Sequence, residues 1–350
     1  KITVLIIDDS SVIRNIIKEL LSDVDDIEVV GEAKDPLIAR TLIKQLNPDV
    51  LTLDVEMPKM DGITFLRNLM RLRPMPVVMI STLTEHGAPA TLDALEIGAI
   101  DYIAKPKGGS WGALDDYAGI IQEKVRSAAR ANLTARECLS SVSPRKEQAK
   151  AGKIETNIKF KPGKVICIGS STGGTEAIKE VLHGMPVNCP PILLAQHIPA
   201  VFSASLAERL NRICEITVRE AKPGMPLEPG NAYLAPGDFH LKIIEKNGRL
   251  ITALDDGDKV NGHKPSVDVL FHSATERVGK NVVAAILTGM GSDGAIGLKG
   301  VLDYGGMTFV QDEESSVVWG MPGAAVKLDA AQKILPIQRI RSGLLKACER

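Results

Sequence analysis

The sequence predicts an α/β protein of two domains, and three features along its 350 residues support this. Short apolar runs alternate with helical periodicities up to about residue 125. A polar, basic segment interrupts the alternation at 126–160, and a second alternation fills 161–350. Because single helices between buried strands make neighbouring strands parallel, we expect domain 1–125 to be a doubly wound sheet of five parallel strands. The second domain is expected to be a mostly parallel α/β sheet with an antiparallel excursion.

Five apolar runs in the first domain each fit a short buried strand. They are Ile2–Ile7, Ile27–Val30, Val50–Leu53, Val77–Ile80 and Ile100–Ala104. Between the first two, apolar residues from Val12 to Leu21 recur at i, i+3 and i+4, which is the period of a helix with one buried face.

The second domain has seven further strand candidates. They are Val165–Ile168, Ile192–Ala195, Glu215–Val218, Asn231–Leu234, Leu241–Ile244, Val282–Leu287 and Met307–Val310. Helices are expected at Glu176–Leu182 and Phe202–Arg212. The stretch 215–255 has the short runs and turn residues of paired strands, and it is the source of the expected antiparallel excursion.

Composition excludes several classes of partner. With 42 Lys and Arg against 43 Asp and Glu, the net charge is −1. The protein as a whole therefore has no positive electrostatic potential that would attract nucleic acid or an anionic membrane. No apolar run approaches the roughly 20 residues of a membrane span, so no direct membrane insertion is expected. Five cysteines form no C-x-x-C pair, which favours free thiols in a reducing compartment and a cytoplasmic location.

Five polar residues follow the strands of the first domain. Asp8 and Asp9 follow the first, Asp54 the third, and Ser81 and Lys105 end the fourth and fifth. In a doubly wound sheet these strand ends meet at one crevice. Three clustered carboxylates need a cation, and their hard oxygens suit Mg²⁺. The hydroxyl and ammonium groups could then hold a phosphoryl group carried on Asp54.

A glycine-rich turn, Gly169 to Gly174, joins the first strand of the second domain to a helix. It matches neither G-x-G-x-x-G nor a Walker A loop. Two alternatives remain open at this point. The turn could cradle an anion at a helix N-terminus, or its G-x-S-x-G spacing could be a nucleophile elbow centred on Ser171.

A nucleophilic serine needs a base, and His197 is the best placed of six histidines because it directly follows the second strand of its domain. The others are His86 in the first domain, His183 at the wrong side of the sheet, and His240, His263 and His272, interpreted as turn or helix residues.

The orienting acid is expected from a third strand end. Asp293 lies in the glycine-rich loop after Val282–Leu287, where its carboxylate could fix the tautomer of His197. Amides of the same loop could form an oxyanion hole, with Met290 N–H as a candidate. The chain order Ser, His, Asp differs from that of α/β-hydrolases.

Two resemblances follow from these motifs. V-L-I-I-D-D-S, L-T-L-D-V-E-M-P-K-M-D-G and A-K-P resemble the response-regulator receiver family over about 120 residues. This implies a flavodoxin-like strand order, phosphorylation of Asp54 by a chemotaxis histidine kinase, Mg²⁺ held by Asp8, Asp9 and Asp54, and sensing of the phosphoryl group by Ser81 and Lys105. It also implies a cis bond before Pro106.

In the second domain, I-G-S-S-T-G-G-T-E-A, A-Q-H-I-P, Y-L-A-P-G-D, P-S-V-D-V-L-F-H-S and I-L-T-G-M-G-S-D-G-A resemble the chemotaxis protein-glutamate methylesterase family. The resemblance implies a catalytic triad of Ser171, His197 and Asp293, with no cofactor for the ester chemistry. It implies hydrolysis of glutamate γ-methyl esters, and deamidation of glutamines, on the cytoplasmic domains of methylated chemoreceptors. Phosphorylation of the receiver would activate the esterase.

Two other functions are weighed against this one. The second domain could bind a nucleotide or phosphate on its glycine-rich turn without covalent chemistry. The chain could also be a DNA-binding response regulator, but 164–350 has no basic helix-turn-helix pattern, so no nucleic-acid partner is expected.

Overall fold

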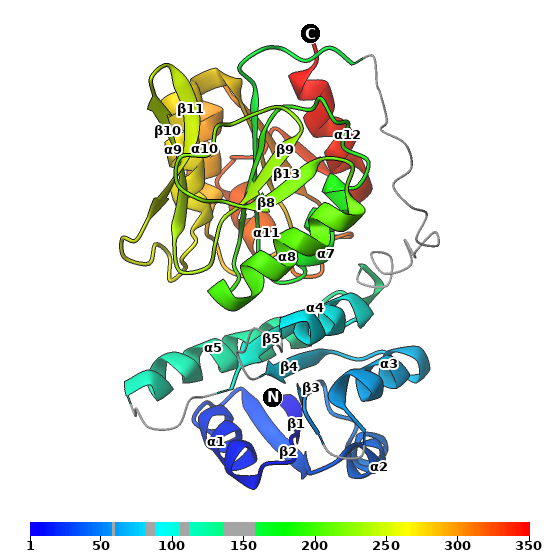
Figure 1. Cartoon of the computed structure of the whole chain (residues 1–350). Coiled ribbons are helices and arrows are strands. Elements are labelled where there is room, and N and C mark those ends of the chain that lie inside the picture. The colour runs from blue at the N-terminus through cyan, green and yellow to red at the C-terminus, as the bar shows by residue number, and fades with distance from the viewer. Residues whose placement is uncertain (58–59, 82–87, 106–111, 136–157) are drawn as a thin grey trace. The chain divides into compact units, whose positions relative to one another are not determined.

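A computed structural model describes residues 1–57, 60–81, 88–105, 112–135 and 158–350, with only the backbone at 112–116. The chain forms two compact units, Lys1–Ser140 and Ser141–Arg350 (Figure 1). Both are α/β, as expected from the sequence. The predicted linker, 126–160, lies largely outside the described residues, so the domain limits at 125 and 161 remain a prediction.

The N-terminal unit alternates strands and helices along its whole length. Its elements are β1 (Ile2–Ile7), α1 (Ser11–Ser22), β2 (Ile27–Ala33), α2 (Pro36–Leu46), β3 (Val50–Asp54), α3 (Gly62–Leu72), β4 (Val77–Ser81), α4 (Ala88–Ile97), β5 (Asp101–Ala104) and α5 (Gly112–Ala129). The strands form one parallel sheet in the order β2-β1-β3-β4-β5. All five predicted strands and the flavodoxin-like order are confirmed.

The sheet of this unit is buried on both faces. Every residue of β3 and β4 is buried, because α1 packs beside α5 and α3 beside α4. Side-chain caps fix where the helices begin: Asp35 accepts hydrogen bonds from the first amides of α2, and Asp61 does the same for α3. The strand order reverses between β1 and β3, so their carboxyl ends border one crevice.

The C-terminal unit is built on a larger sheet. Its elements are β6 (Val165–Ser170), α7 (Gly174–Leu182), β7 (Ile192–Gln196), α8 (Ala200–Ile213), β8 (Thr217–Glu220), β9 (Asn231–Leu234), β10 (His240–Lys246), β11 (Arg249–Asp255), α9 (Val267–Val278), η1 (Gly279–Asn281), β12 (Val282–Ile286), α10 (Ala295–Asp303), β13 (Met307–Gln311), α11 (Met321–Lys327), β14 (Lys333–Leu335) and α12 (Ile337–Cys348). The main sheet is parallel throughout, in the order β14-β13-β12-β6-β7-β9-β8.

The expected antiparallel excursion is a separate ribbon, in which β10 pairs with β11. Two strands were not predicted from the sequence, β11 and the edge strand β14. The strand expected at Glu215–Val218 lies two residues further on, at Thr217–Glu220.

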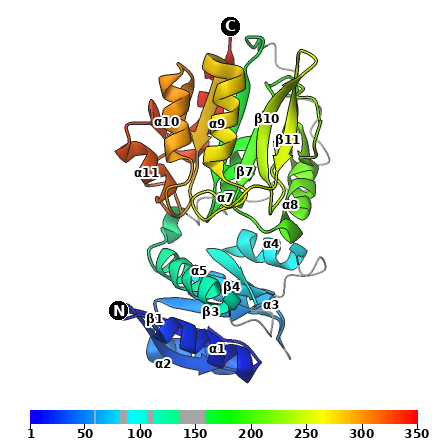
Figure 2. The same cartoon turned by 90° about the vertical axis from the view of Figure 1, so that its left-hand side faces the viewer.

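Helices cover both faces of the main sheet. Helix α9 packs beside α10 and α10 beside α11, whereas α7 packs beside α8 and α12 (Figures 1 and 2). The central strands β12, β6 and β7 are fully buried and lie side by side. Their carboxyl ends therefore converge at the point where the strand order changes direction, and ligand sites of open α/β sheets lie at such points.

Within the described residues, no helix is both long and apolar enough to cross a membrane. The peptide bond between Lys264 and Pro265 is cis. The cis bond expected before Pro106 falls outside the described residues.

Candidate active site

The turn after β6 has the sharp geometry of a nucleophile elbow. Gly173 has φ of 75°, and a Cβ on Gly174 would lie 2.2 Å from Oε1 of Gln196, so neither position readily accepts a side chain. The Ser171 amide donates to Thr288 O at 3.1 Å, and Ser171 O accepts from Gly174 N at 2.7 Å. These bonds hold the partly exposed Ser171 on the rim formed by β6 and β12.

The neighbouring serine has a different environment. Ser170 is fully buried and donates its hydroxyl to Oε1 of Gln196 at 2.7 Å. Nε2 of Gln196 donates in turn to the carbonyl of Ser171 at 2.9 Å and to that of His197 at 3.2 Å. Gln196 thus joins the two strand ends and was missed in the sequence, where its only signal is a polar residue at the end of a buried strand.

His197 and Asp293 form a direct pair. Nε2 of His197 lies 2.8 Å from Oδ2 of Asp293, and only 8% of the imidazole side chain is exposed. An ionised carboxylate accepts hydrogen bonds only, so Nε2 must carry the proton and Nδ1 keeps its lone pair. Nδ1 is buried and makes no hydrogen bond with any described residue. It is therefore the ring nitrogen with a lone pair available to accept a proton, and no hydrogen bond joins it to Ser171 in this structure.

Asp293 is held as an anion by the start of helix α9. Its other hydrogen bonds come from Ser266 Oγ at 2.8 Å, Val267 N at 2.7 Å, Asp268 N at 3.3 Å and Asn261 Nδ2 at 2.9 Å. Burial by itself would raise the pKa of this carboxyl. The donors, first of all His197, instead hold the pKa of Asp293 well below its usual range.

The other described histidines occupy different positions in the C-terminal unit. His263 stacks on His197, with ring centroids 3.7 Å apart and an angle of 9° between the planes. His272 lies on α9, as expected.

The interpretation of His240 as a turn or helix residue was wrong: it begins β10 and is buried, accepting from Ser266 N and contacting Asp258 O. Its burial depends on these distant partners, which the sequence does not reveal. His183 follows α7, and His86 lies outside the described residues.

The loop after β12 also contains the oxyanion candidate. Gly289 N donates to Val318 O, and Gly289 O accepts from the amides of Gly320 and Met321. Both polar groups of Gly289 are thus already paired within the protein. Met290, the next residue on the loop that leads to Asp293, stays the candidate donor.

The predicted acidic pocket forms in the N-terminal unit. Carboxylate oxygens of Asp8, Asp9 and Asp54 lie within 4.8 Å of one another. Lys105 Nζ is 3.1 Å from Oδ2 of Asp8 and 2.7 Å from Oδ2 of Asp54. Burial raises the pKa of both buried carboxyls, that of Asp54 to about 6, and Lys105 opposes the rise.

Ser81 closes the same rim, where its hydroxyl accepts a hydrogen bond from Thr91 of α4 at 3.0 Å. Thr91 was not predicted as a site residue from the sequence. The three carboxylates fit a divalent cation: they are hard oxygen donors, two are buried, and among the described residues a single ammonium group, that of Lys105, pairs with them.

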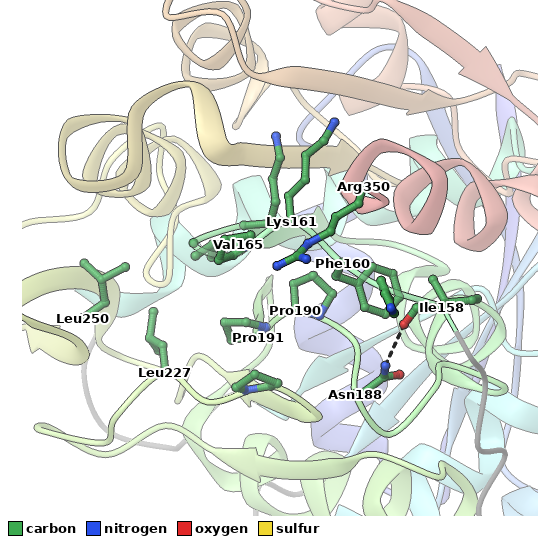
Figure 3. Close-up of a pocket in the computed structure, with 15 residues that line it drawn as sticks. Ile158, Phe160, Lys161, Val165, Asn188, Pro190, Pro191, Leu227, Leu250 and Arg350 are labelled. Carbon is green, nitrogen blue, oxygen red and sulfur yellow. Dashed lines mark hydrogen bonds between the residues drawn. The ribbon is translucent and has the colours of Figure 1, made fainter.

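A hollow of about 560 Å³ lies at the amino ends of the strands of the main sheet, away from the Ser171 rim. Figure 3 shows Lys161, Val165, Pro190, Leu250 and Arg350 around it. Val165 begins β6 and Pro190 lies just before β7, so this hollow borders the amino ends of the strands. Its lining includes none of the residues at the Ser171 rim.

Comparison with known proteins identifies the family of each unit. Residues 4–110 match the family model for the response regulator receiver domain, and 166–344 match that for the CheB methylesterase. A protein-glutamate methylesterase/protein-glutamine glutaminase 1 of Xanthomonas euvesicatoria is 52% identical over 345 residues, covering 98% of this chain and 96% of the relative. A protein-glutamate methylesterase/protein-glutamine glutaminase of Chromohalobacter salexigens is 48% identical over 351 residues, covering 100% and 97%.

Among solved structures, the CheB methylesterase catalytic domain of Thermotoga maritima is 42% identical, with a TM-score of 0.52. It covers 53% of this chain, and 98% of that domain is matched. Family models account for both units in chain order, and the relatives are similar over nearly their whole length. The chain therefore belongs to the CheB methylesterase family, with a receiver domain ahead of the esterase domain.

Proposed function

We propose that the chain is a phosphorylation-activated serine hydrolase that removes γ-methyl esters from glutamates of chemoreceptors and deamidates glutamines. The names of its relatives support the reaction, and the two family matches support its control by a receiver. The observation that carries the residue assignment is the His197–Asp293 pair, which leaves Nδ1 of His197 as an acceptor at the rim that also bears Ser171.

In the proposed reaction, Ser171 Oγ gives its proton to Nδ1 of His197 and attacks the ester carbonyl carbon. The Met290 amide stabilises the resulting oxyanion. The carbon–oxygen bond to the methoxy group then breaks as the His197 imidazolium protonates the methoxy oxygen, which gives methanol. Water, deprotonated by the same Nδ1, attacks the acyl-serine; the bond to Ser171 Oγ breaks, His197 returns the proton to Ser171, and glutamate is released. With a glutamine substrate, ammonia leaves instead of methanol.

Asp293 takes no proton in this scheme. It keeps the hydrogen of His197 on Nε2 and stabilises the imidazolium when it forms. Its low pKa supports this role, since the carboxylate remains ionised at neutral pH and well below it.

We propose Asp54 as the phosphoacceptor, with a histidine kinase of the chemotaxis system as the donor. Asp8, Asp9 and Asp54 would hold Mg²⁺, which offsets the negative charge around the phosphoryl group when bound. Lys105 and Ser81 would contact the phosphoryl oxygens through their ammonium and hydroxyl groups. We propose a cytoplasmic location because the proposed substrate sites and kinase lie there.

The test is methanol release from membranes that contain methylated receptors, with and without a small-molecule phosphodonor. We expect release that depends on Ser171 and rises with the donor. A fluorophosphonate that reacts with serine nucleophiles separates this function from anion binding on the glycine-rich turn. A chain that is not labelled at Ser171 and releases no methanol would contradict the proposal.

A further inference from the structure

The segment from Val260 to Asp268 touches the His197–Asp293 pair at several points. It begins with a two-residue turn: Val260 N donates to His263 O at 3.1 Å, and His263 N donates to Val260 O at 3.0 Å. The central residues, Asn261 and Gly262, have φ of 53° and 80°. Asn-Gly is the preferred pair for this tight hairpin turn because both residues tolerate positive φ.

Both ends of the segment are anchored to Asp293. Asn261 Nδ2 donates to Oδ1 of Asp293, and Ser266 Oγ donates to the same oxygen. Asn261 Nδ2 also donates to Oδ2 of Asp268 at 2.7 Å, so the turn is tied to α9 as well. His263 lies between these anchors, and its ring position is therefore fixed relative to the carboxylate.

The ring of His197 needs such a fixed neighbour. Its only side-chain hydrogen bond among the described residues is the one from Nε2 to Asp293. One hydrogen bond sets a distance but leaves the ring able to tilt about that bond, and tilting would change the direction in which the Nδ1 lone pair points. A parallel ring at 3.7 Å blocks the tilt on one face and keeps water from it.

We infer that His263 is a positioning residue for the esterase reaction: its stacked ring orients His197 so that Nδ1 is directed at Ser171. The inference rests on the triad assigned in the proposed function. His263 acts through its planar ring and takes no proton in the reaction, since Asp293 is bonded to His197 Nε2. A neutral aromatic ring should therefore replace it, whereas a residue without a ring should not.

The test measures the rate of Ser171 labelling by a fluorophosphonate in the full-length protein, together with kcat and KM for methanol release. For His263→Ala and His263→Asn, we expect labelling and kcat to fall roughly 10- to 100-fold, the range for a misaligned catalytic group, with little change in KM. His263→Phe should stay within about threefold of the wild type because it restores the stack. His272→Ala, an exposed histidine on α9, is the matched control and should leave both rates unchanged.

Two results would overturn the inference. Normal labelling of His263→Asn would show that no ring is needed, and a His263→Phe protein as slow as His263→Asn would show that the imidazole acts by its nitrogen atoms. The His263→Asn and His263→Phe variants still test the inference if His263→Ala lowers the melting temperature. Failure of the proposed function is distinguishable, because Ser171→Ala would then be labelled as fast as the wild type.

Discussion

Replacing Asp293 with asparagine tests the catalytic pair most directly. An Asn side chain has one oxygen and one NH₂ group, so one of the two carboxylate positions becomes a donor. With the NH₂ at the Oδ1 position, it would face the donors of Asn261, Ser266 and Asp268. At the Oδ2 position it would oppose only Val267 N and Nε2 of His197. The second orientation loses fewer hydrogen bonds and should dominate.

That orientation has a defined chemical consequence. The NH₂ group donates to Nε2 of His197, so the imidazole proton must move to Nδ1, and Nδ1 can no longer accept the proton of Ser171. We expect kcat for methanol release to fall about 10⁴-fold, as when the acid of a serine protease triad becomes an amide. This corresponds to about 5.5 kcal/mol of activation free energy.

The same change should alter stability in a pH-dependent way. Losing the charge and the Val267 bond should lower the free energy of unfolding by about 2–4 kcal/mol at pH 7. The folded-state pKa of Asp293 is depressed, so its stabilising contribution is complete above the unfolded pKa of about 3.9 and is lost as the pH falls below that value. Urea unfolding of wild type and Asp293→Asn should therefore converge in acid.

Asp268→Asn is the matched control, since Asp268 is a buried neighbour that accepts from Gly297 N and Asn261 but does not contact His197. It should lower stability while keeping kcat within about tenfold of the wild type. An Asp293→Asn protein that retained kcat within the same range would refute the tautomer argument.

Three further predictions concern other residues. Ser171→Ala should abolish methanol release, whereas Ser170→Ala should keep release and lower the melting temperature slightly, because Ser170 is a buried donor to Gln196. Asp54→Asn should keep basal release but lose its increase with a phosphodonor, measured on the same receptor membranes. Gln196→Leu removes three hydrogen bonds that join the ends of β6 and β7. Urea unfolding should show a loss of about 3 kcal/mol, and kcat should fall with it.

The strands were predictable where they are buried and parallel, because such strands read as continuous apolar runs. β3 and β4 are examples, with every residue buried. β14 was missed because it is a three-residue edge strand with exposed side chains. β11 was missed because its side chains are only partly buried and follow no uniform apolar run.

The site residues divide in the same way. The position of Ser171, His197 and Asp293 at one rim was predictable because each follows a central strand; their roles in a triad stay a prediction. Asn261 and His263 were not, because they reach that rim through a turn between β11 and α9, and no sequence rule gives the direction of such a loop. Asn-Gly at 261–262 does signal a tight turn, but its target becomes visible only in three dimensions.

The two units place an aspartate at the same edge of a similar sheet and give it opposite electrostatic surroundings. Asp293 receives hydrogen bonds from His197, Ser266, Asn261 and the first amides of α9, so its charge is stable before any substrate arrives. Among the described residues, Asp54 accepts one backbone hydrogen bond, from Glu56, and faces the like charge of Asp8, with Lys105 as its nearby cation. A carboxylate that already accepts several hydrogen bonds would lose them on covalent modification. A carboxylate that accepts few hydrogen bonds can be modified at lower cost and can then bind new partners. The fold supplies the crevice in both cases, and the local donors set the electrostatic surroundings that we propose suit Asp293 to a fixed charge and Asp54 to covalent modification.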